Sequence, residues 1–331
     1  MSTEIGKARG LGLCSGGLDS MLSGLLLREQ GIEVEWITFE TPFFAASKAR
    51  KAARITGIPL TVKSIFADYI VMLRNPPAGY GKRMNPCLDC HTLMFRLAGD
   101  IMRERGFDFL FSGEVLGQRP MSQTKPSLRY VEKHSGMDGY ILRPLSAKLL
   151  PETIPEQQGL VDRERLLGFH GRGRKDQIAL ARKFGITDYP APAGGCLLTD
   201  KGFSARLKDL FDHGGDCTEA EFELLKFGRH FRLNRQAKLI VGRTEEDNEN
   251  ILRRHNLQRD VVLDVPDHPS PIGLLQGAAD KGSILLAAAI CVGYSRAPKL
   301  APVNVVVKRS TGEEVIQTIA VLPDDVRKLM I

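Results

Sequence analysis

Residues 14 to 20 read Cys-Ser-Gly-Gly-Leu-Asp-Ser, and they stand between a short apolar run (11–13) and an apolar stretch with helical spacing. This order predicts a strand, a tight glycine turn and the first turn of a helix. Such a turn aims backbone N–H groups and the positive end of the helix dipole at an anion, and Asp19 stands where a carboxylate can hold Mg²⁺. The candidate anion-binding residues are Ser15, Gly16, Gly17, Asp19 and Ser20.

The pattern Ser-Gly-Gly-X-Asp-Ser lacks the lysine of the kinase-type phosphate loop. A plain strand-to-helix turn needs two glycines and a helix cap, but not this whole string. The string resembles the pyrophosphate loop of ATP pyrophosphatases, enzymes that adenylate a substrate and release pyrophosphate. The resemblance implies that ATP is bound here, with pyrophosphate on residues 15–20 and Mg²⁺ near Asp19.

Length and composition predict a two-domain protein without a membrane segment. The chain has 331 residues, of which 43% are hydrophobic and 26% charged. It contains no apolar stretch long enough to cross a bilayer, and residues 1–7 lack the apolar core of a signal peptide, so we expect a cytoplasmic protein. The net charge of +7 favours a polyanionic partner.

The first 185 or so residues alternate between strand-like and helix-like runs, which predicts an α/β fold with a doubly wound parallel sheet. In such sheets ligands bind beyond the carboxyl ends of the strands, so the glycine turn and residues 112–118 are expected to face one crevice. The predicted strands are 10–14, 34–40, 60–65, 108–113 and 140–145, and the predicted helices are 18–30, 45–56, 89–105, 122–132 and 175–184.

A Pro/Gly-rich stretch at 189–196 predicts irregular chain, and a second, smaller α+β domain is expected beyond it. We expect a first domain at 1–189, a linker at 190–202 and the second domain at 203–331. The second domain is predicted to contain helices at 203–211, 219–229, 245–254 and 283–294, and strands at 238–242, 261–265, 303–308 and 313–319, the last two joined as a hairpin at 311–312.

A second motif, Asn-Pro-Cys-Leu-Asp-Cys-His at 85–91, places Cys87 and Cys90 at the start of a predicted helix, where the dipole stabilises thiolates. Cys196 lies in the flexible linker, within reach of the same crevice. Three cysteines favour, in this order, a [4Fe–4S] cluster with one open iron, a persulfide carrier with a resolving thiol, or a Zn²⁺ site completed by His91. The alternative is that Cys87 and Cys90 are buried as small hydrophobic residues.

A third segment, Phe-Ser-Gly-Glu-Val-Leu-Gly-Gln-Arg-Pro-Met-Ser-Gln-Thr at 111–124, is followed by Ile-Leu-Arg-Pro-Leu at 141–145. Together with the first two motifs, it resembles the catalytic domain of tRNA 4-thiouridine synthetases, over about the first half of the chain. That family shares an adenine nucleotide alpha hydrolase-like fold. The resemblance implies that Gly113, Glu114 and Gln118 contact the nucleotide or the base.

The chain is expected to depart from that family by lacking its N-terminal RNA-binding domain and its rhodanese-type domain. In their place, residues 231–249 and 287–295 resemble the NFACT-R domain, also called DUF814, which implies RNA binding. Two groups of basic residues are candidate phosphate contacts. The first group is Arg229, Arg232, Arg235, Lys238 and Arg243, and the second is Arg163, Arg165, Arg172, Arg174 and Lys175.

The leading hypothesis is an ATP-dependent sulfurtransferase that adenylates a uridine carbonyl oxygen in tRNA and replaces it with sulfur, giving 4-thiouridine or 2-thiouridine. A cysteine desulfurase or another donor would supply the sulfur. The alternatives are a small-molecule acceptor and a non-enzymatic RNA-binding accessory of the translation machinery. The candidate catalytic residues are Asp19, Cys87, Cys90 and Cys196, of which the three cysteines are also the candidate metal ligands.

Overall fold

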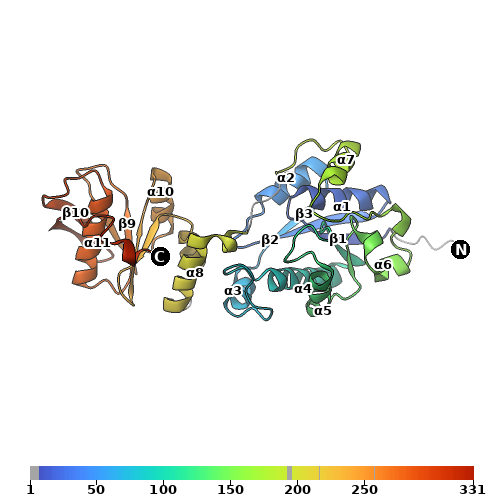
Figure 1. Ribbon diagram of the computed structural model, residues 1–331, viewed down its shortest axis with the longest axis horizontal. Helices are drawn as coiled ribbons and strands as arrows, with labels where there is room; N and C mark the ends of the chain where they lie inside the picture. Colours follow the sequence, from blue (N-terminus) through green and yellow to red (C-terminus); the bar gives the residue numbers. More distant parts are fainter. Residues whose placement is uncertain (1–6, 192–195, 216, 257) are drawn as a thin grey trace. The chain divides into compact units, whose positions relative to one another are not determined.

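The computed structural model describes residues 7–191, 196–215, 217–256 and 258–331 (Figure 1). The chain divides into two compact units, Met1–Cys196 and Leu197–Ile331. Residues 192–195 of the expected linker lie outside the described residues.

The first unit is built on a five-stranded sheet in the order β3-β2-β1-β4-β5, in which every neighbouring pair is parallel. The order places β1 at the centre with β4 beside it, so the turns that follow these two strands leave the same edge of the sheet. The strands are β1 (Arg9–Leu13), β2 (Glu33–Glu40), β3 (Leu60–Ser64), β4 (Phe109–Ser112) and β5 (Ile141–Leu142).

Helices cover both faces of this sheet, which confirms the predicted doubly wound α/β fold (Figure 1). One face carries α1 (Leu18–Glu29), α2 (Ser47–Thr56) and α7 (Lys175–Lys183). The other carries α3 (Phe66–Arg74), α4 (Cys87–Arg105) and α5 (Lys125–Ser135), while the short α6 (Ile154–Gln157) follows β5.

Three elements of the first unit differ from the sequence prediction, one of them the short helix α6, which was not predicted. The strand expected at 140–145 is reduced to two residues, because Pro144 has no N–H to donate and cannot extend the ladder. The helix α3 at Phe66–Arg74 was not predicted, because it lies in a short apolar run without a clear helical period.

The second unit is built on a six-stranded antiparallel sheet in the order β11-β10-β8-β9-β7-β6. One face packs on α11 (Lys281–Tyr294), and the other packs on α9 (Glu219–Leu224) and α10 (Glu245–Arg254). The helix α8 (Lys201–His213) precedes them. The strands are β6 (Arg229–Arg232), β7 (Ala237–Val241), β8 (Val261–Asp264), β9 (Gly273–Gly277), β10 (Val303–Arg309) and β11 (Gly312–Thr318).

Three sequence predictions for this unit were wrong in detail. The helix expected to run to Arg229 ends at Leu224, and Arg229 instead begins β6, a four-residue edge strand whose two central residues are buried. The strand β9 was missed, because its apolar run is short and flanked by glycines. Gly312 is already paired with Arg309 in the final hairpin, so the loop is 310–311.

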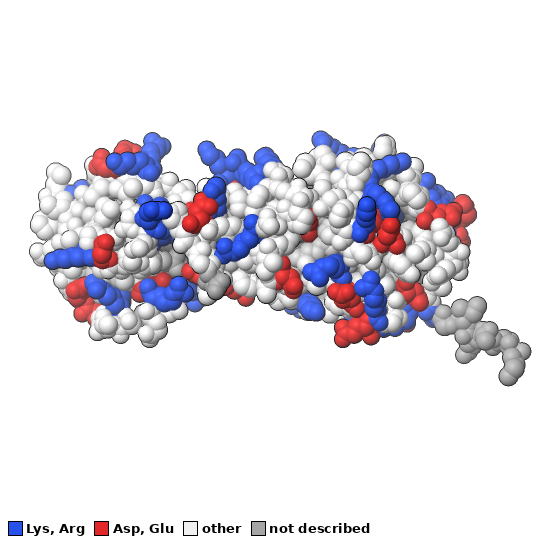
Figure 2. Space-filling view, turned by 90° about the horizontal axis from the view of Figure 1, so that it is seen from below, with Lys and Arg blue, Asp and Glu red and all other residues white. Residues whose placement is uncertain are grey.

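Basic side chains are spread over the surface of both units. Figure 2 shows Lys and Arg on this face intermixed with Asp and Glu, without a single broad patch of one sign. No helix among the described residues is both long and apolar enough to cross a membrane.

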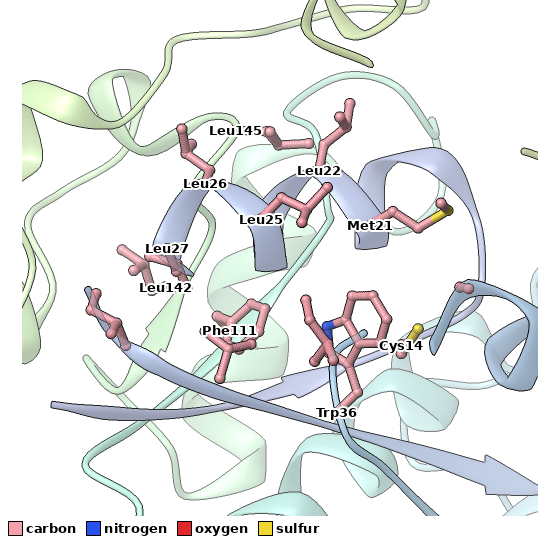
Figure 3. Packing of buried hydrophobic residues seen from close by; sticks show 14 of the residues in the cluster. Cys14, Met21, Leu22, Leu25, Leu26, Leu27, Trp36, Phe111, Leu142 and Leu145 are labelled. Atoms are coloured by element: carbon pink, nitrogen blue, oxygen red, sulfur yellow. The ribbon is translucent and has the colours of Figure 1, made fainter. Parts of the chain in front are cut away.

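Each unit has its own hydrophobic core. In the first unit, the apolar face of α1 packs over Trp36 of β2 and Phe111 of β4, both almost fully buried (Figure 3). In the second unit, Phe231 and Leu239 pack against α11. Burial of α1 along nearly its whole length anchors the glycine turn that precedes it.

Candidate active site

The residues of the glycine turn are held together by hydrogen bonds between its two serines. Ser15 Oγ and Ser20 Oγ lie 3.0 Å apart, and the backbone N–H of Ser15 donates to Ser20 Oγ at 3.3 Å. Gly16 has a φ of 72°, and a Cβ built there would lie 2.2 Å from the backbone carbon of Lys48. The turn therefore requires glycine at this position.

Asp19 lies in the first turn of α1 with one carboxylate oxygen paired and the other unpaired. Gln118, in the loop after β4, donates from Nε2 to Asp19 Oδ2 at 2.8 Å. Asp19 Oδ1 is buried and has no hydrogen-bond partner among the described residues. Burial raises the pKa of Asp19, whereas the hydrogen bond from Gln118 and the positive charges of Arg174 and Arg119 oppose that rise.

An unpaired buried carboxylate oxygen is suited to a hard cation, and Mg²⁺ prefers such oxygen ligands. The residues present therefore fit the Mg²⁺ that the sequence predicted near Asp19. The chemistry it would supply is charge neutralisation on phosphate oxygens.

Gly113 brings the loop after β4 against the start of α1. A Cβ built on Gly113 would lie 2.4 Å from the backbone carbon of Asp19 and 2.5 Å from the backbone nitrogen of Ser20. Only glycine permits this approach, so Gly113 has a packing role beside the loop that was predicted to bind phosphate.

The three cysteines singled out in the sequence lie in one neighbourhood. Cys87 begins α4, and Cys90 is one turn further along the same helix. The Tyr69 hydroxyl, on α3, forms a hydrogen bond with the Cys90 thiol. The charges of Cys87 and Cys196 each raise the pKa of Cys90 and the pKa of Tyr69. Cys196 therefore lies near the start of α4.

The two cysteines of α4 differ in their surroundings. Burial raises the pKa of Cys90 to about 12, and the hydrogen bond from Tyr69 only partly offsets it. Burial also raises the pKa of Cys87, but a hydrogen bond with Asn85 and the positive charge of Arg119 oppose the shift. Cys87 is therefore the more readily ionised thiol of the pair.

The expected metal site has no counterpart in the placement of these thiols. Within 7–191, 196–215, 217–256 and 258–331, no group of three or more His, Cys, Asp or Glu side chains is arranged to hold a metal ion. His91, the fourth ligand predicted for a zinc site, lies with Nδ1 at 3.0 Å from Glu114 Oε1.

Glu114 connects the helix that carries the cysteines with the strands beside it. Its carboxylate contacts His91 of α4, accepts from Ser112 Oγ at 3.1 Å and accepts from Arg143 Nε at 3.0 Å. Arg143, whose side chain is 2% exposed, also pairs with Glu132 of α5. Burial by itself would raise the pKa of Glu114, but the charge of Arg143 and the hydrogen bond with His91 outweigh it and lower the pKa to about 2.

Four residues of this region were not among the predicted site residues. Tyr69 carried no signal in the sequence, because it comes from the unpredicted helix α3. Arg143 stands in the Arg-Pro-Leu motif that carried the family resemblance, which was the available signal. Arg119 follows Gln118 directly, whereas Arg174 was assigned to a basic group rather than to this site.

The fold and the site define an α/β unit with a glycine turn of the pyrophosphate-loop type, joined to an antiparallel-sheet unit. Residues 6–149 match the family described as thiamine biosynthesis protein (ThiI), and residues 228–330 match the NFACT protein RNA binding domain. The chain therefore carries a ThiI-type pyrophosphate-loop domain followed by an NFACT-type RNA-binding domain, as the resemblance implied.

Curated relatives match parts of the chain at low identity. A tRNA-specific 2-thiouridylase (MnmA) of Desulforamulus reducens is 26% identical over 216 residues, which are 57% of this chain and 54% of the relative. A probable tRNA sulfurtransferase of Pediococcus pentosaceus is 27% identical over 146 residues, which are 41% of this chain and 34% of the relative. The chain thus spans about half or less of the length of these two relatives.

Among solved structures, a predicted subunit of a tRNA methyltransferase from Methanocaldococcus jannaschii aligns with a TM-score of 0.35 and 16% identity. The alignment covers 53% of this chain and 76% of that one.

Proposed function

We propose that the protein is an ATP-dependent sulfurtransferase that thiolates a uridine of tRNA. The observation that supports this proposal is that the first unit contains two candidate sites. A glycine turn with an unpaired Asp19 oxygen lies at one site, and three cysteines lie around Tyr69 at the other. Arg119 links them, because its charge acts on both Asp19 and Cys87.

The first half-reaction is adenylation of the base. A uracil carbonyl oxygen attacks the α-phosphorus of ATP, the bond from that phosphorus to the bridging oxygen breaks, and pyrophosphate leaves. In this proposal, the glycine turn at 15–20 donates N–H and O–H groups to the departing phosphates. The protein contributes here by positioning the reactants and neutralising charge.

The second half-reaction replaces the oxygen with sulfur. The terminal sulfur of a persulfide on Cys87 attacks the adenylated carbon, the C–O bond breaks, and AMP leaves with the electron pair. The thiolate of Cys196 then attacks the Cys87 sulfur, which breaks the S–S bond and releases the thiouridine. The resulting disulfide is reduced by an external thiol, and a donor such as a cysteine desulfurase reloads Cys87.

Cys87 is the preferred carrier for two reasons. It stands at the start of α4, where the helix dipole stabilises a thiolate, and the pKa of Cys90 is raised further than its own. No group of three potential metal-ligating side chains lies together among the described residues, so the cysteines give no positive support for a [4Fe–4S] cluster or Zn²⁺. The persulfide form, second in the order expected from the sequence, is therefore the one proposed.

RNA would be held with help from the second unit, whose family is described by its RNA binding. Arg243 is a candidate contact, because its side chain is 47% exposed and lies beside Arg206, although its Nε also pairs with Asp247 at 2.9 Å. Arg232 and Lys238, assigned to the same basic group in the sequence, instead pair with the buried Asp209.

The test is reconstitution of the purified chain with unmodified tRNA, ATP, Mg²⁺ and a cysteine desulfurase with cysteine. Pyrophosphate release that depends on tRNA, and a thionucleoside in the digested tRNA, are the expected results. The same digest identifies 2-thiouridine or 4-thiouridine. Asp19→Asn should abolish both products. Asp100→Asn, which removes an exposed carboxylate paired with Arg103 on α4, should leave them unchanged.

Two results would overturn the proposal. Tight, salt-sensitive tRNA binding without any ATP turnover would identify an RNA-binding accessory protein. Pyrophosphate release driven by a small molecule and indifferent to tRNA would identify another acceptor. Iron and zinc contents of the anaerobically purified protein decide between persulfide and metal forms.

A further inference from the structure

Two buried polar atoms of opposite charge lack hydrogen-bond partners near the glycine turn. One is Asp19 Oδ1, and the other is Nε of Arg174, the residue immediately before α7; neither has a partner among the described residues. Buried polar atoms in folded proteins are nearly always paired, so such atoms often mark a place that a ligand completes.

Two hydrogen bonds connect Asp19 with the first turn of α7, which Arg174 directly precedes. Gln118 donates to Asp19 Oδ2 at 2.8 Å, and the Gln118 side-chain oxygen accepts from Gln177 Nε2 at 3.4 Å. Gln177 is buried in the first turn of α7, three residues after Arg174. The charge of Arg174 also acts directly on the Asp19 carboxylate.

The structure separates Arg174 from the basic group to which the sequence assigned it. Arg163 is bound to Glu156 and to two backbone carbonyls, and Arg165 donates to the carbonyl of Glu29. These two arginines are therefore engaged within the fold rather than offered to RNA. Arg172 is exposed, while Arg174 is partly buried beside the Asp19–Gln118 pair.

We propose that Arg174 binds the pyrophosphate end of the nucleotide, together with a cation held by Asp19 Oδ1. This inference rests on the proposed use of ATP. A guanidinium suits this task, because it stays charged and offers several donors to phosphate oxygens. One bound Mg²⁺–pyrophosphate group would satisfy both unpaired atoms, and Arg174 would stabilise the charge that pyrophosphate gains as it leaves.

The test is titration calorimetry of the full chain with Mg²⁺–pyrophosphate and, separately, with AMP. Arg174→Gln should weaken pyrophosphate binding about tenfold or more, the loss expected for a charged hydrogen bond, and should leave AMP binding unchanged. Arg174→Lys should recover part of the affinity. Arg182→Gln, which alters an exposed arginine in the last turn of α7, is the matched control and should bind like the unaltered protein.

The outcomes separate this inference from the proposed function. If the unaltered protein binds neither Mg²⁺–pyrophosphate nor ATP, the proposed function itself fails. If it binds both and Arg174→Gln binds pyrophosphate equally well, only the role of Arg174 is refuted. If Arg174→Gln loses tRNA affinity and binds pyrophosphate as before, Arg174 contacts RNA and not pyrophosphate. Equal unfolding midpoints of the variants exclude a folding defect.

Discussion

At the scale of single residues, the site depends on close approaches that only small side chains allow. Gly16 lies against the backbone of Lys48, and Gly113 lies against the backbone of Asp19 and Ser20. These contacts set the distance between the end of β4 and the start of α1. A methyl group at either position must displace backbone rather than a flexible side chain.

Gly113→Ala should therefore damage the site more than it damages the fold. Its Cβ would lie 2.4 Å from the Asp19 backbone carbon, so α1 must shift, at a cost of about 1–3 kcal/mol. We expect weaker Mg²⁺–pyrophosphate binding, measured by calorimetry, and a lower free energy of unfolding in urea. Gly202→Ala in α8 is the control, because its Cβ meets nothing closer than 3.6 Å. Equal effects of the two substitutions would contradict the argument.

The low pKa of Glu114 predicts that acid destabilises the first unit. Its pKa is lowered from 4.5 to about 2 in the folded protein, so its contribution to stability is present above pH 4.5 and is lost as the pH falls toward 2. Glu114→Gln should be less stable at pH 7, and its stability should fall less steeply between pH 5 and 3. Urea unfolding over that range measures both effects, and parallel curves for the two proteins would refute the assignment.

At the scale of elements, polar contacts fix the first turns of α4, while apolar side chains are buried along the rest of the helix. Asp89 accepts a hydrogen bond from the backbone of Ala78 at 2.9 Å, and His91 contacts Glu114. The Glu114–Arg143 pair then ties the helix to β4 and β5. The cysteine motif, the Gly-Glu motif and the Arg-Pro-Leu motif are thus three parts of one polar network.

In the second unit, α8 is attached to the sheet through a buried charge cluster. Asp209 of α8 accepts two hydrogen bonds from Arg232 of β6 and lies 3.8 Å from Lys238 of β7. Burial lowers the pKa of Lys238 from 10.5 to about 8, although the Asp209 charge opposes the shift. The residues that match the RNA-binding family begin at 228, so α8 is joined to that domain through this cluster.

The lowered pKa of Lys238 predicts that the free energy of unfolding increases at alkaline pH. Between pH 8 and 10.5 the unfolded chain keeps the lysine proton that the folded protein has lost, so its contribution to the free energy of unfolding increases with pH. Lys238→Met should reduce this increase, measured by urea unfolding at pH 7.5, 8.5 and 9.5. A variant with the same pH slope as the unaltered protein would exclude Lys238 as its source.

At the scale of the whole molecule, the proposed catalytic and RNA-binding functions lie in different units. The candidate chemistry lies in Met1–Cys196, and the domain named for RNA binding lies in Leu197–Ile331. The basic residues are spread over both, so the net charge of +7 does not by itself locate an RNA surface.

Arg243→Gln should weaken tRNA binding without altering the nucleotide site. If Arg243 contacts a phosphate, the slope of log affinity against log salt should become shallower by roughly 0.7 to 0.9. Filter binding at four salt concentrations measures the slope, and calorimetry with Mg²⁺–pyrophosphate should show no change. Arg129→Gln in the first unit, whose guanidinium pairs with Asp138, is the control. An unchanged slope in Arg243→Gln would place the RNA elsewhere.

The sequence by itself determined the parallel α/β fold of the first unit, the glycine turn and the three cysteines, because local periodicity and motif spacing encode them directly. It did not reveal β6 and β9, since short edge or glycine-flanked strands are defined by their partners. The sequence also did not distinguish the role of Arg174 from that of the other basic residues at 163–175. Only the tertiary structure showed that Arg174 lies near Asp19 and that Glu114 binds His91 and Arg143. Burial and long-range pairing decide such roles, and neither is encoded in the local pattern of residues.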